Sequence, residues 1–190
     1  MKQKTILFDI NETVLDLTTL KPKFKEAFGD ESTMSTWFSM LLHSSTVCIT
    51  TGIKADFATL AGTMLESIAA RMDITLSNSM RNGILSGFAS LEPHEDIKPA
   101  LTQLKSAGFR VIAFSNSSLN LISTQMKNSG LNEYFDDIIS VEETGSFKPD
   151  PKVYRFAANL LSAIGSIETG GYSRLGYSWC FVCWNECGVY

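Results

Sequence analysis

The fold of this chain is decided near its amino terminus by the stretch Thr5-Ile6-Leu7-Phe8-Asp9-Ile10-Asn11-Glu12-Thr13-Val14-Leu15-Asp16. A short apolar run rich in β-forming residues ends abruptly in a carboxylate, and turn-forming residues follow. Buried parallel strands have this pattern, and they present the side chain at their carboxyl end to a crevice in which ligands bind. The pattern therefore predicts a buried strand with Asp9 in such a crevice. A strand-end or helix-capping Asp without chemistry is the alternative.

The composition is that of a globular protein. Of the 190 residues, 44% are hydrophobic, which permits one core of ordinary size or one core carrying an insertion. The net charge is −4 and no run of Lys or Arg is present, so neither a nucleic acid nor an anionic membrane surface is an expected partner. The pattern predicts no secretory leader and no membrane span, and we expect a cytoplasmic protein. The four cysteines show no spaced disulfide framework.

The segment between Leu17 and about Glu92 has a helical pattern. Apolar residues recur there at the helical period, and Pro22 and Gly29 suit the first position and the end of a short helix. The predicted helices run from Pro22 to Phe28, from Thr33 to Leu42, from Lys54 to Met72 and from Ile74 to Ser86. We expect their apolar faces to form a core rather than a cofactor site.

From Asp96 onward the pattern changes to alternating helices and strands. The sequence predicts a helix to Ser106, a strand over residues 110–114, a helix from Ser118 to about Gly130 and a strand over residues 137–141. This alternation is typical of βαβ units, in which helices cover a parallel sheet. We therefore predict a core made of residues 1–16 and 93–190, with residues 17–92 inserted as a helical cap.

Two further strand ends carry polar residues. Ser115 and Asn116 follow the second predicted strand, just before a helix whose N-terminus offers free N–H groups and the positive end of its dipole. This is the outline of an anion site, and a plain serine cap is the alternative. Lys148 lies in a Pro-flanked loop before a helix that Pro151 can open. A solvated charge is the usual interpretation of a surface lysine, but a lysine fixed in this way is more often functional.

Together these motifs resemble the haloacid dehalogenase superfamily, whose hydrolases use an aspartate nucleophile. The motifs are Phe8-Asp9-x-Asn11-x-Thr13, Ser115-Asn116 and Lys148-Pro149-x-Pro151, at the ends of consecutive strands. Over roughly residues 4–160 the chain is most similar to the type II branch of 2-haloacid dehalogenases. The resemblance implies a Rossmann-like, three-layer α/β core with a parallel sheet and an inserted helical cap that closes over the site.

The resemblance also implies a role for each motif residue. Asp9 would attack the halogen-bearing carbon and form an ester, which water then hydrolyses. Thr13 and Ser115 would hydrogen-bond the carboxylate of Asp9 or of the substrate, and Lys148 would hold its positive charge beside Asp9. The predicted catalytic residues are thus Asp9, Thr13, Ser115 and Lys148, and the predicted substrate-binding residues are Asn11, Asn116 and Tyr154.

Asn11 separates two branches of the superfamily. Its phosphatases carry a second Asp two residues after the nucleophile, as general acid for the leaving oxygen, and they need Mg²⁺ to neutralise the phosphoryl group. A halide leaves without a proton, so an amide here favours carbon–halogen cleavage with no metal or other cofactor. A Mg²⁺-dependent phosphatase of a small metabolite is the alternative. The expected partner is a small-molecule substrate, and a homodimer is left open.

One departure from the family concerns the cation that binds the substrate. The well-described dehalogenases use an Arg from the first cap helices for the halide and the substrate carboxylate, whereas residues 37–43 contain none. His43 and Lys54 are the candidate substitutes. The resemblance therefore does not name the substrate within the small 2-halocarboxylates.

The tail after about Ser162 departs from the family pattern. The resemblance places a last strand and a final acidic motif here, yet residues 170–184 contain no Asp or Glu. If the coding sequence is read one base further on, its codons can encode the family's motif. At some positions the shifted codon allows only one residue; the codons of Trp179 and Cys180, for example, then give only Gly. We therefore predict a shifted reading frame that begins near Leu161 or Ser162.

Two alternatives follow for this tail. A thiol site for a metal or a disulfide in Cys180-x-x-Cys183-x-x-x-Cys187 competes with the shifted frame. A chain without the last motif, which in the family positions the hydrolytic water, would instead be a family member with little or no turnover. The nucleotide sequence around codons 155–190 separates the shifted frame from the thiol site.

Overall fold

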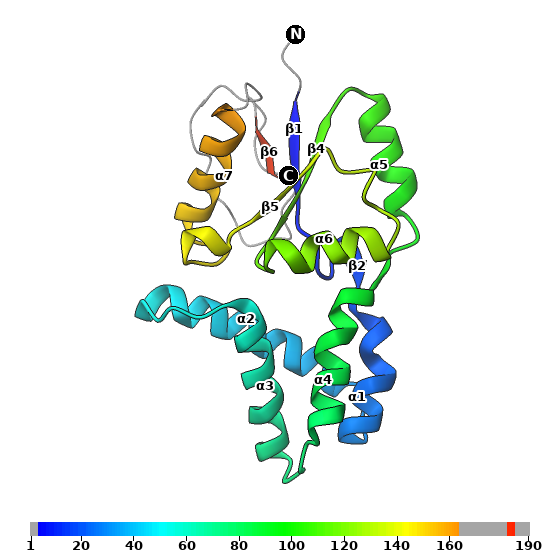
Figure 1. Ribbon diagram of the computed structural model, residues 1–190, viewed down its shortest axis with the longest axis vertical. Coiled ribbons are helices and arrows are strands. Elements are labelled where there is room, and N and C mark those ends of the chain that lie inside the picture. The colour runs from blue at the N-terminus through cyan, green and yellow to red at the C-terminus, as the bar shows by residue number, and fades with distance from the viewer. Residues whose placement is uncertain (1–3, 164–181, 185–190) are drawn as a thin grey trace.

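A four-stranded sheet with strand order β5-β4-β1-β6 carries the core in the computed structural model, which describes residues 4–163 and 182–184 (Figure 1). Its strands are β1 (Thr5–Phe8), β4 (Arg110–Ser115), β5 (Asp137–Ser140) and β6 (Val182–Trp184). β1 and β5 run parallel to β4, whereas β6 pairs antiparallel with β1. The three parallel strands therefore bring their carboxyl ends to one edge of the sheet.

Helices cover both faces of this sheet. They are α5 (Ile97–Ser106), α6 (Leu119–Asn128) and α7 (Pro151–Ala163), and a 3-10 helix η3 (Glu142–Thr144) follows β5. Because side chains alternate along a strand, Leu7 and Phe114 pack in a cluster with α7, while Ile6 and Phe8 belong to the larger cluster that includes α5 and α6. Figure 1 shows α7 on one side of the sheet and α5 and α6 on the other. The predicted three-layer α/β core is confirmed.

A group of helices, here called the helical insert, lies beyond the carboxyl edge of the sheet (Figure 1). It consists of η1 (Leu17–Leu20), α1 (Lys21–Phe28), α2 (Thr33–Thr51), α3 (Phe57–Arg71), α4 (Asn78–Gly87) and η2 (Phe88–Ser90). Two short strands, β2 (Leu15–Asp16) and β3 (Glu92–Pro93), pair where the chain enters and leaves it. They lie at the predicted boundaries, while the division into a core and a closing cap stays a prediction.

Trp37 forms the centre of the helical insert. It is fully buried, and its ring centroid lies 5.3 Å from that of Phe24 and 5.4 Å from that of Phe88. Its indole N–H donates to the carbonyl oxygen of Ala61 over 2.9 Å, so the polar end of the buried ring has a partner. Aromatic packing therefore joins α1, α2 and η2 at the centre of the insert, and the indole hydrogen bond links α2 to α3.

Three helices of the insert differ from the prediction at their ends. α2 continues to Thr51 rather than Leu42, because Cys48 packs in the core. The hydroxyls of Thr50 and Thr51 donate to backbone carbonyls of the preceding turn, so these polar side chains are satisfied within the helix. α3 and α4 begin later than predicted, since Asp56 and Ser77 cap them. Within the described residues, each helix is either too short or too polar for a membrane span.

Candidate active site

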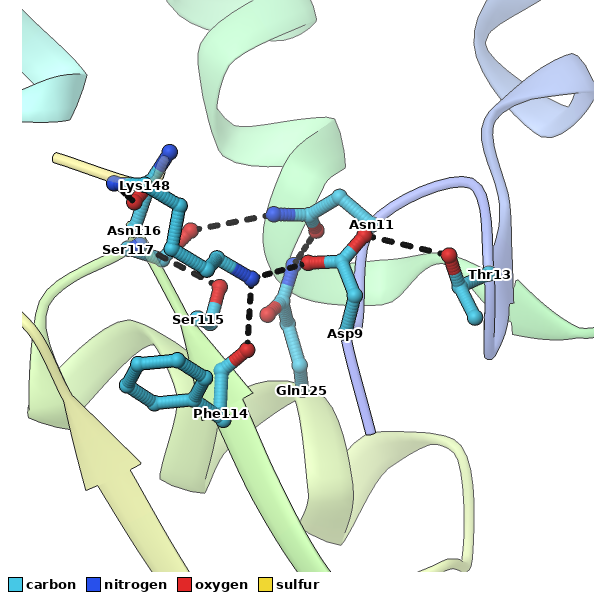
Figure 2. A network of polar contacts seen from close by, with 9 residues as sticks. All are labelled: Asp9, Asn11, Thr13, Phe114, Ser115, Asn116, Ser117, Gln125 and Lys148. Carbon is cyan, nitrogen blue, oxygen red and sulfur yellow. Dashed lines mark hydrogen bonds and ion pairs between the residues drawn. The ribbon is translucent and has the colours of Figure 1, made fainter. Parts of the chain in front are cut away.

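Asp9 follows β1 directly, and both oxygens of its carboxylate have partners in the protein (Figure 2). Lys148 Nζ lies 2.5 Å from Oδ1, and the Thr13 hydroxyl donates to Oδ2 over 3.1 Å. About a third of the Asp9 side chain, 32%, is exposed. The carboxylate is thus held in one orientation by a cation and a hydroxyl, and it remains accessible to a small molecule.

The loop after β1 returns Thr13 to this carboxylate. Three successive N–H groups, those of residues 13–15, donate to the carbonyl oxygen of Ile10, so the chain turns tightly around that oxygen. Glu12 has φ 66°, in the left-handed region that favours glycine. Its carboxylate accepts the Leu17 N–H over 3.1 Å, and this bond ties the turn to the start of η1.

Lys148 is fixed along its whole length. Its backbone N–H donates to Asn116 Oδ1 over 2.9 Å, and its Nζ donates to the Phe114 carbonyl oxygen over 2.7 Å as well as to Asp9. The ammonium also lies 5.1 Å from the centroid of the Phe114 ring. Only 15% of the lysine side chain is exposed. The structure therefore places a fixed positive charge against the carboxylate, in a short charge-assisted hydrogen bond.

The loop that carries Lys148 is anchored by Asp150. Its carboxylate accepts the Ser146 hydroxyl over 2.6 Å and the Lys152 N–H over 2.8 Å at the start of α7. Partial burial raises the pKa of Asp150, but these hydrogen bonds and the charges of Lys152 and Arg155 outweigh it and hold the pKa below its ordinary value. The charged form of Asp150 therefore stabilises this loop.

The other predicted residues lie at the same edge with partners of their own. Ser115 Oγ accepts the Ser117 N–H over 3.2 Å, and the described part of the chain shows no hydrogen bond from Ser115 to the carboxylate at the end of β1. Asn116 is engaged with the backbone of the lysine loop. The Tyr154 ring lies edge-on to the Phe114 ring, with 5.6 Å between centroids. Contacts of these residues with a substrate stay predictions.

Asn11 is buried, with both ends of its amide engaged (Figure 2). Nδ2 donates to Ser117 Oγ over 3.1 Å, and Oδ1 accepts from Gln125 Nε2 over 3.0 Å. The sequence analysis missed Gln125, which is fully buried on α6. A signal was present, because Gln125 lies on the apolar face of the helix with Ile122 and Met126, where an amide needs partners.

The two candidate substitutes for the missing arginine lie in different places. His43 lines a groove of about 740 Å³, whose described lining residues all belong to α2 and α3. Lys54 is exposed three residues before Phe57, whose ring centroid lies 6.1 Å from that of Phe147. Phe147 immediately precedes Lys148 in the sequence. The segment that carries Lys54 therefore contacts the loop of Lys148 through Phe57, whereas His43 lines the groove between α2 and α3.

Two sequence predictions concern metals and the tail. Among residues 4–163 and 182–184, no set of three His, Cys, Asp or Glu side chains could hold a metal ion. The predicted start of the frame change, near Leu161 or Ser162, lies in the last turn of α7. Its effect on the last motif, and Cys180 and Cys187, lie outside the described residues. For Cys183 only the backbone is described, in β6.

A three-layer α/β core, with an Asp–Lys pair at the carboxyl edge of its sheet and helices inserted after the first strand, is a Rossmann-like architecture with a ligand site at that edge. The family of haloacid dehalogenase-like hydrolases matches residues 3–167. The chain belongs to this family.

Individual relatives are similar over most of the chain. (S)-2-haloacid dehalogenase 1 from Pseudomonas sp. strain CBS-3 is 29% identical over 160 residues, which cover 83% of this chain and 70% of that protein. The structure of L-2-haloacid dehalogenase from Xanthobacter autotrophicus has a TM-score of 0.78 at 23% identity, over 84% of this chain and 65% of that one. A structure of the same enzyme with chloropropionic acid covalently bound has a TM-score of 0.77, with the same identity and coverage. This chain thus spans about two thirds of the solved relatives' length, and they share its fold.

Proposed function

We propose that this chain hydrolyses a small 2-halocarboxylate through an ester at Asp9. One observation carries the proposal: the Asp9 carboxylate is 32% exposed and is oriented by Lys148 at 2.5 Å and Thr13 at 3.1 Å. A carboxylate acts as a nucleophile when its negative charge is positioned and partly desolvated. The relatives that bear the name 2-haloacid dehalogenase support the choice of substrate class.

The reaction has two steps that balance without a cofactor. In the first, an Asp9 oxygen bonds to C2 of the substrate, and the carbon–halogen bond breaks with its electron pair leaving on the halide. In the second, water attacks the carbonyl carbon of the ester and releases the 2-hydroxycarboxylate, a proton and the Asp9 carboxylate. The first step needs no general acid, because the halide leaves without a proton. This fits Asn11, whose amide is not an acid and is hydrogen-bonded to Ser117 and Gln125.

The substrate carboxylate is assigned to the loop between β4 and α6, where Ser115 and Asn116 lie near the N-terminus of that helix. Tyr154 is assigned to the same side of the site, through its contact with Phe114. Lys54 is the candidate second cation. The proposed substrate is a small molecule, and the proposed reaction uses no metal. The proposed location is the cytoplasm, and the proposal holds for a monomer or a homodimer.

Chloride release from (S)- and (R)-2-chloropropionate tests the proposal. We expect release from one enantiomer, insensitivity to EDTA, and a loss of at least about a thousandfold in Asp9→Asn, because the nucleophile is removed. Asp16→Asn is the matched control, since Asp16 lies in the same segment but caps η1 by accepting the Thr18 N–H over 2.8 Å. Activity that survives in Asp9→Asn contradicts the proposal. So does EDTA-sensitive phosphate release, or a folded protein with no halide release from any 2-halocarboxylate.

A further inference from the structure

Gln125 has a connection that the proposed reaction does not use. It is fully buried, and its Nε2 donates to Asn11 Oδ1 over 3.0 Å (Figure 2). The same Nε2 donates to the Phe88 carbonyl oxygen over 2.8 Å. Its Oε1 has no hydrogen-bond partner among the described residues. A buried amide with an unpaired oxygen is costly, and an apolar side chain of similar size would avoid that cost. The two donated bonds must therefore account for the glutamine.

The first bond leads to the loops that build the site. Asn11, which accepts the bond from Gln125, itself donates to Ser117 Oγ over 3.1 Å. Ser117 in turn donates its N–H to Ser115 Oγ over 3.2 Å and accepts the Ser140 hydroxyl at its carbonyl oxygen over 2.7 Å. One chain of hydrogen bonds thus joins α6 to the loops that follow β1 and β4 and to Ser140 at the end of β5.

The second bond leads to the helical insert. Phe88 opens η2, the segment through which the chain leaves the insert, and its ring lies 5.4 Å from the buried Trp37 ring in an edge-on contact. The Phe88 carbonyl therefore belongs to a residue whose ring packs at the aromatic centre of the insert. A single NH₂ group on Gln125 holds this carbonyl and the Asn11 amide at the same time.

We propose that Gln125 is a positioning residue that couples the placement of the helical insert to the orientation of the loop that carries Asp9. A shift of Phe88 by about 1 Å would stretch its bond beyond hydrogen-bond range unless Gln125 followed, and following would strain the bond to Asn11. The kinetic consequence rests on the proposed function. The structural consequence, a more mobile loop when the coupling is cut, does not.

The test compares two variants on the same face of α6. Gln125→Met keeps the side-chain length and removes both donors. Asn128→Ala is the control, because Asn128 donates to the neighbouring carbonyl of Ala89 in η2 over 2.8 Å without contacting Asn11. In hydrogen–deuterium exchange, Gln125→Met is expected to exchange residues 9–17 at least about tenfold faster, and Asn128→Ala to stay within about twofold of the unmodified chain.

Kinetics supply the second readout. Gln125→Met is expected to lower kcat for chloride release at least about tenfold with KM within about threefold, since the nucleophile is misoriented rather than the substrate lost. A merely structural glutamine would lower the urea midpoint and leave both the exchange of residues 9–17 and kcat unchanged, and that result overturns the proposal. Equal effects in Asn128→Ala also overturn it.

A third variant guards against failed folding. If Gln125→Met does not fold, Ser117→Ala cuts the same chain of bonds on the far side of Asn11 and is expected to speed exchange in residues 9–17 as well. Unchanged exchange there overturns the coupling. A lack of chloride release in the unmodified chain counts against the proposed function alone, because the exchange measurement needs no turnover.

Discussion

The carboxyl edge of the sheet and the helical insert keep their shapes by different means. At the edge, Asp9 and Lys148 are held by hydrogen bonds of 2.5–3.1 Å and remain partly accessible. In the insert, Trp37 is fully buried among aromatic rings. Hydrogen bonds are directional and contribute little net stability, whereas apolar burial stabilises strongly and without direction. Changes at the edge should therefore alter the chemistry more than stability, and changes in the insert should do the reverse.

Removing the centre of the insert should have the largest effect on stability. Trp37→Ala is expected to lower the free energy of unfolding by about 3–5 kcal/mol, because it empties a large buried site and leaves the Ala61 carbonyl without its donor. Urea denaturation followed by circular dichroism measures this. Trp37→Phe, which keeps a ring, is the milder control. A loss below about 1 kcal/mol in Trp37→Ala would mean that aromatic packing does not hold the insert.

Removing the cation at the edge should act on turnover instead. Lys148→Met is expected to lower kcat for chloride release by about 10²–10³-fold, because the charge that orients Asp9 is lost. The free energy of unfolding should change by no more than about 1 kcal/mol, since the carboxylate left behind is partly solvated. Lys127→Met is the control and should keep most of the activity, because Lys127 is exposed in the last turn of α6. A stability loss as large as that of Trp37→Ala would erase the contrast between the two regions.

A smaller, matched comparison uses one capping aspartate from each region. Asp150 caps α7 beside the lysine loop, and Asp56 caps α3 by accepting the Thr59 N–H over 2.7 Å. Replacing either by Ala should cost about 1 kcal/mol of unfolding free energy near neutral pH. Only Asp150→Ala should also slow chloride release, because only it loosens the loop of Lys148.

The pH dependence of these two variants has a defined sign. Hydrogen bonds from the Thr59 hydroxyl and N–H lower the pKa of Asp56, and the pKa of Asp150 is also below its ordinary value of 3.8. A carboxyl with a lower pKa in the folded chain contributes fully above that ordinary value and loses its contribution as the pH falls through the folded pKa. The stability gap between each Ala variant and the unmodified chain should therefore narrow below about pH 4. A gap that widens on acidification contradicts this account.

Most of the core was predictable because its signals are local. A buried strand ending in Asp9, a strand from Arg110, and Pro151 at the start of α7 are each visible in a few neighbouring residues. The length of α2 was not predictable in this way, since its last turns are rich in Ser and Thr, which have modest helix propensity, and are helical because Cys48 packs in the core and α2 packs on α3. The antiparallel pairing of β6 with β1 was also not predictable from local signals, because it joins residues 5–7 to residues 182–184, at opposite ends of the sequence.

The site divides along the same line. The resemblance to the haloacid dehalogenase superfamily implied that Thr13 and Lys148 lie beside Asp9, and the structure joins them by hydrogen bonds. The partners of Asn11 could not be predicted, because Gln125 is 114 residues away in sequence. Its position on the apolar face of α6 indicates that the amide needs partners, but only the structure shows that these are Asn11 and the Phe88 carbonyl.

The most direct test of the central claim is to trap the ester. The unmodified protein would be mixed with an excess of 2-chloropropionate, and the reaction would be quenched with acid within one turnover. The protein would then be digested, and the peptide masses would be measured by mass spectrometry. The account predicts one added carboxyethyl group, located by fragmentation on Asp9 and absent in the Asp9→Asn variant. Chloride release with an unmodified Asp9, or a carboxyethyl group on another residue, would contradict it.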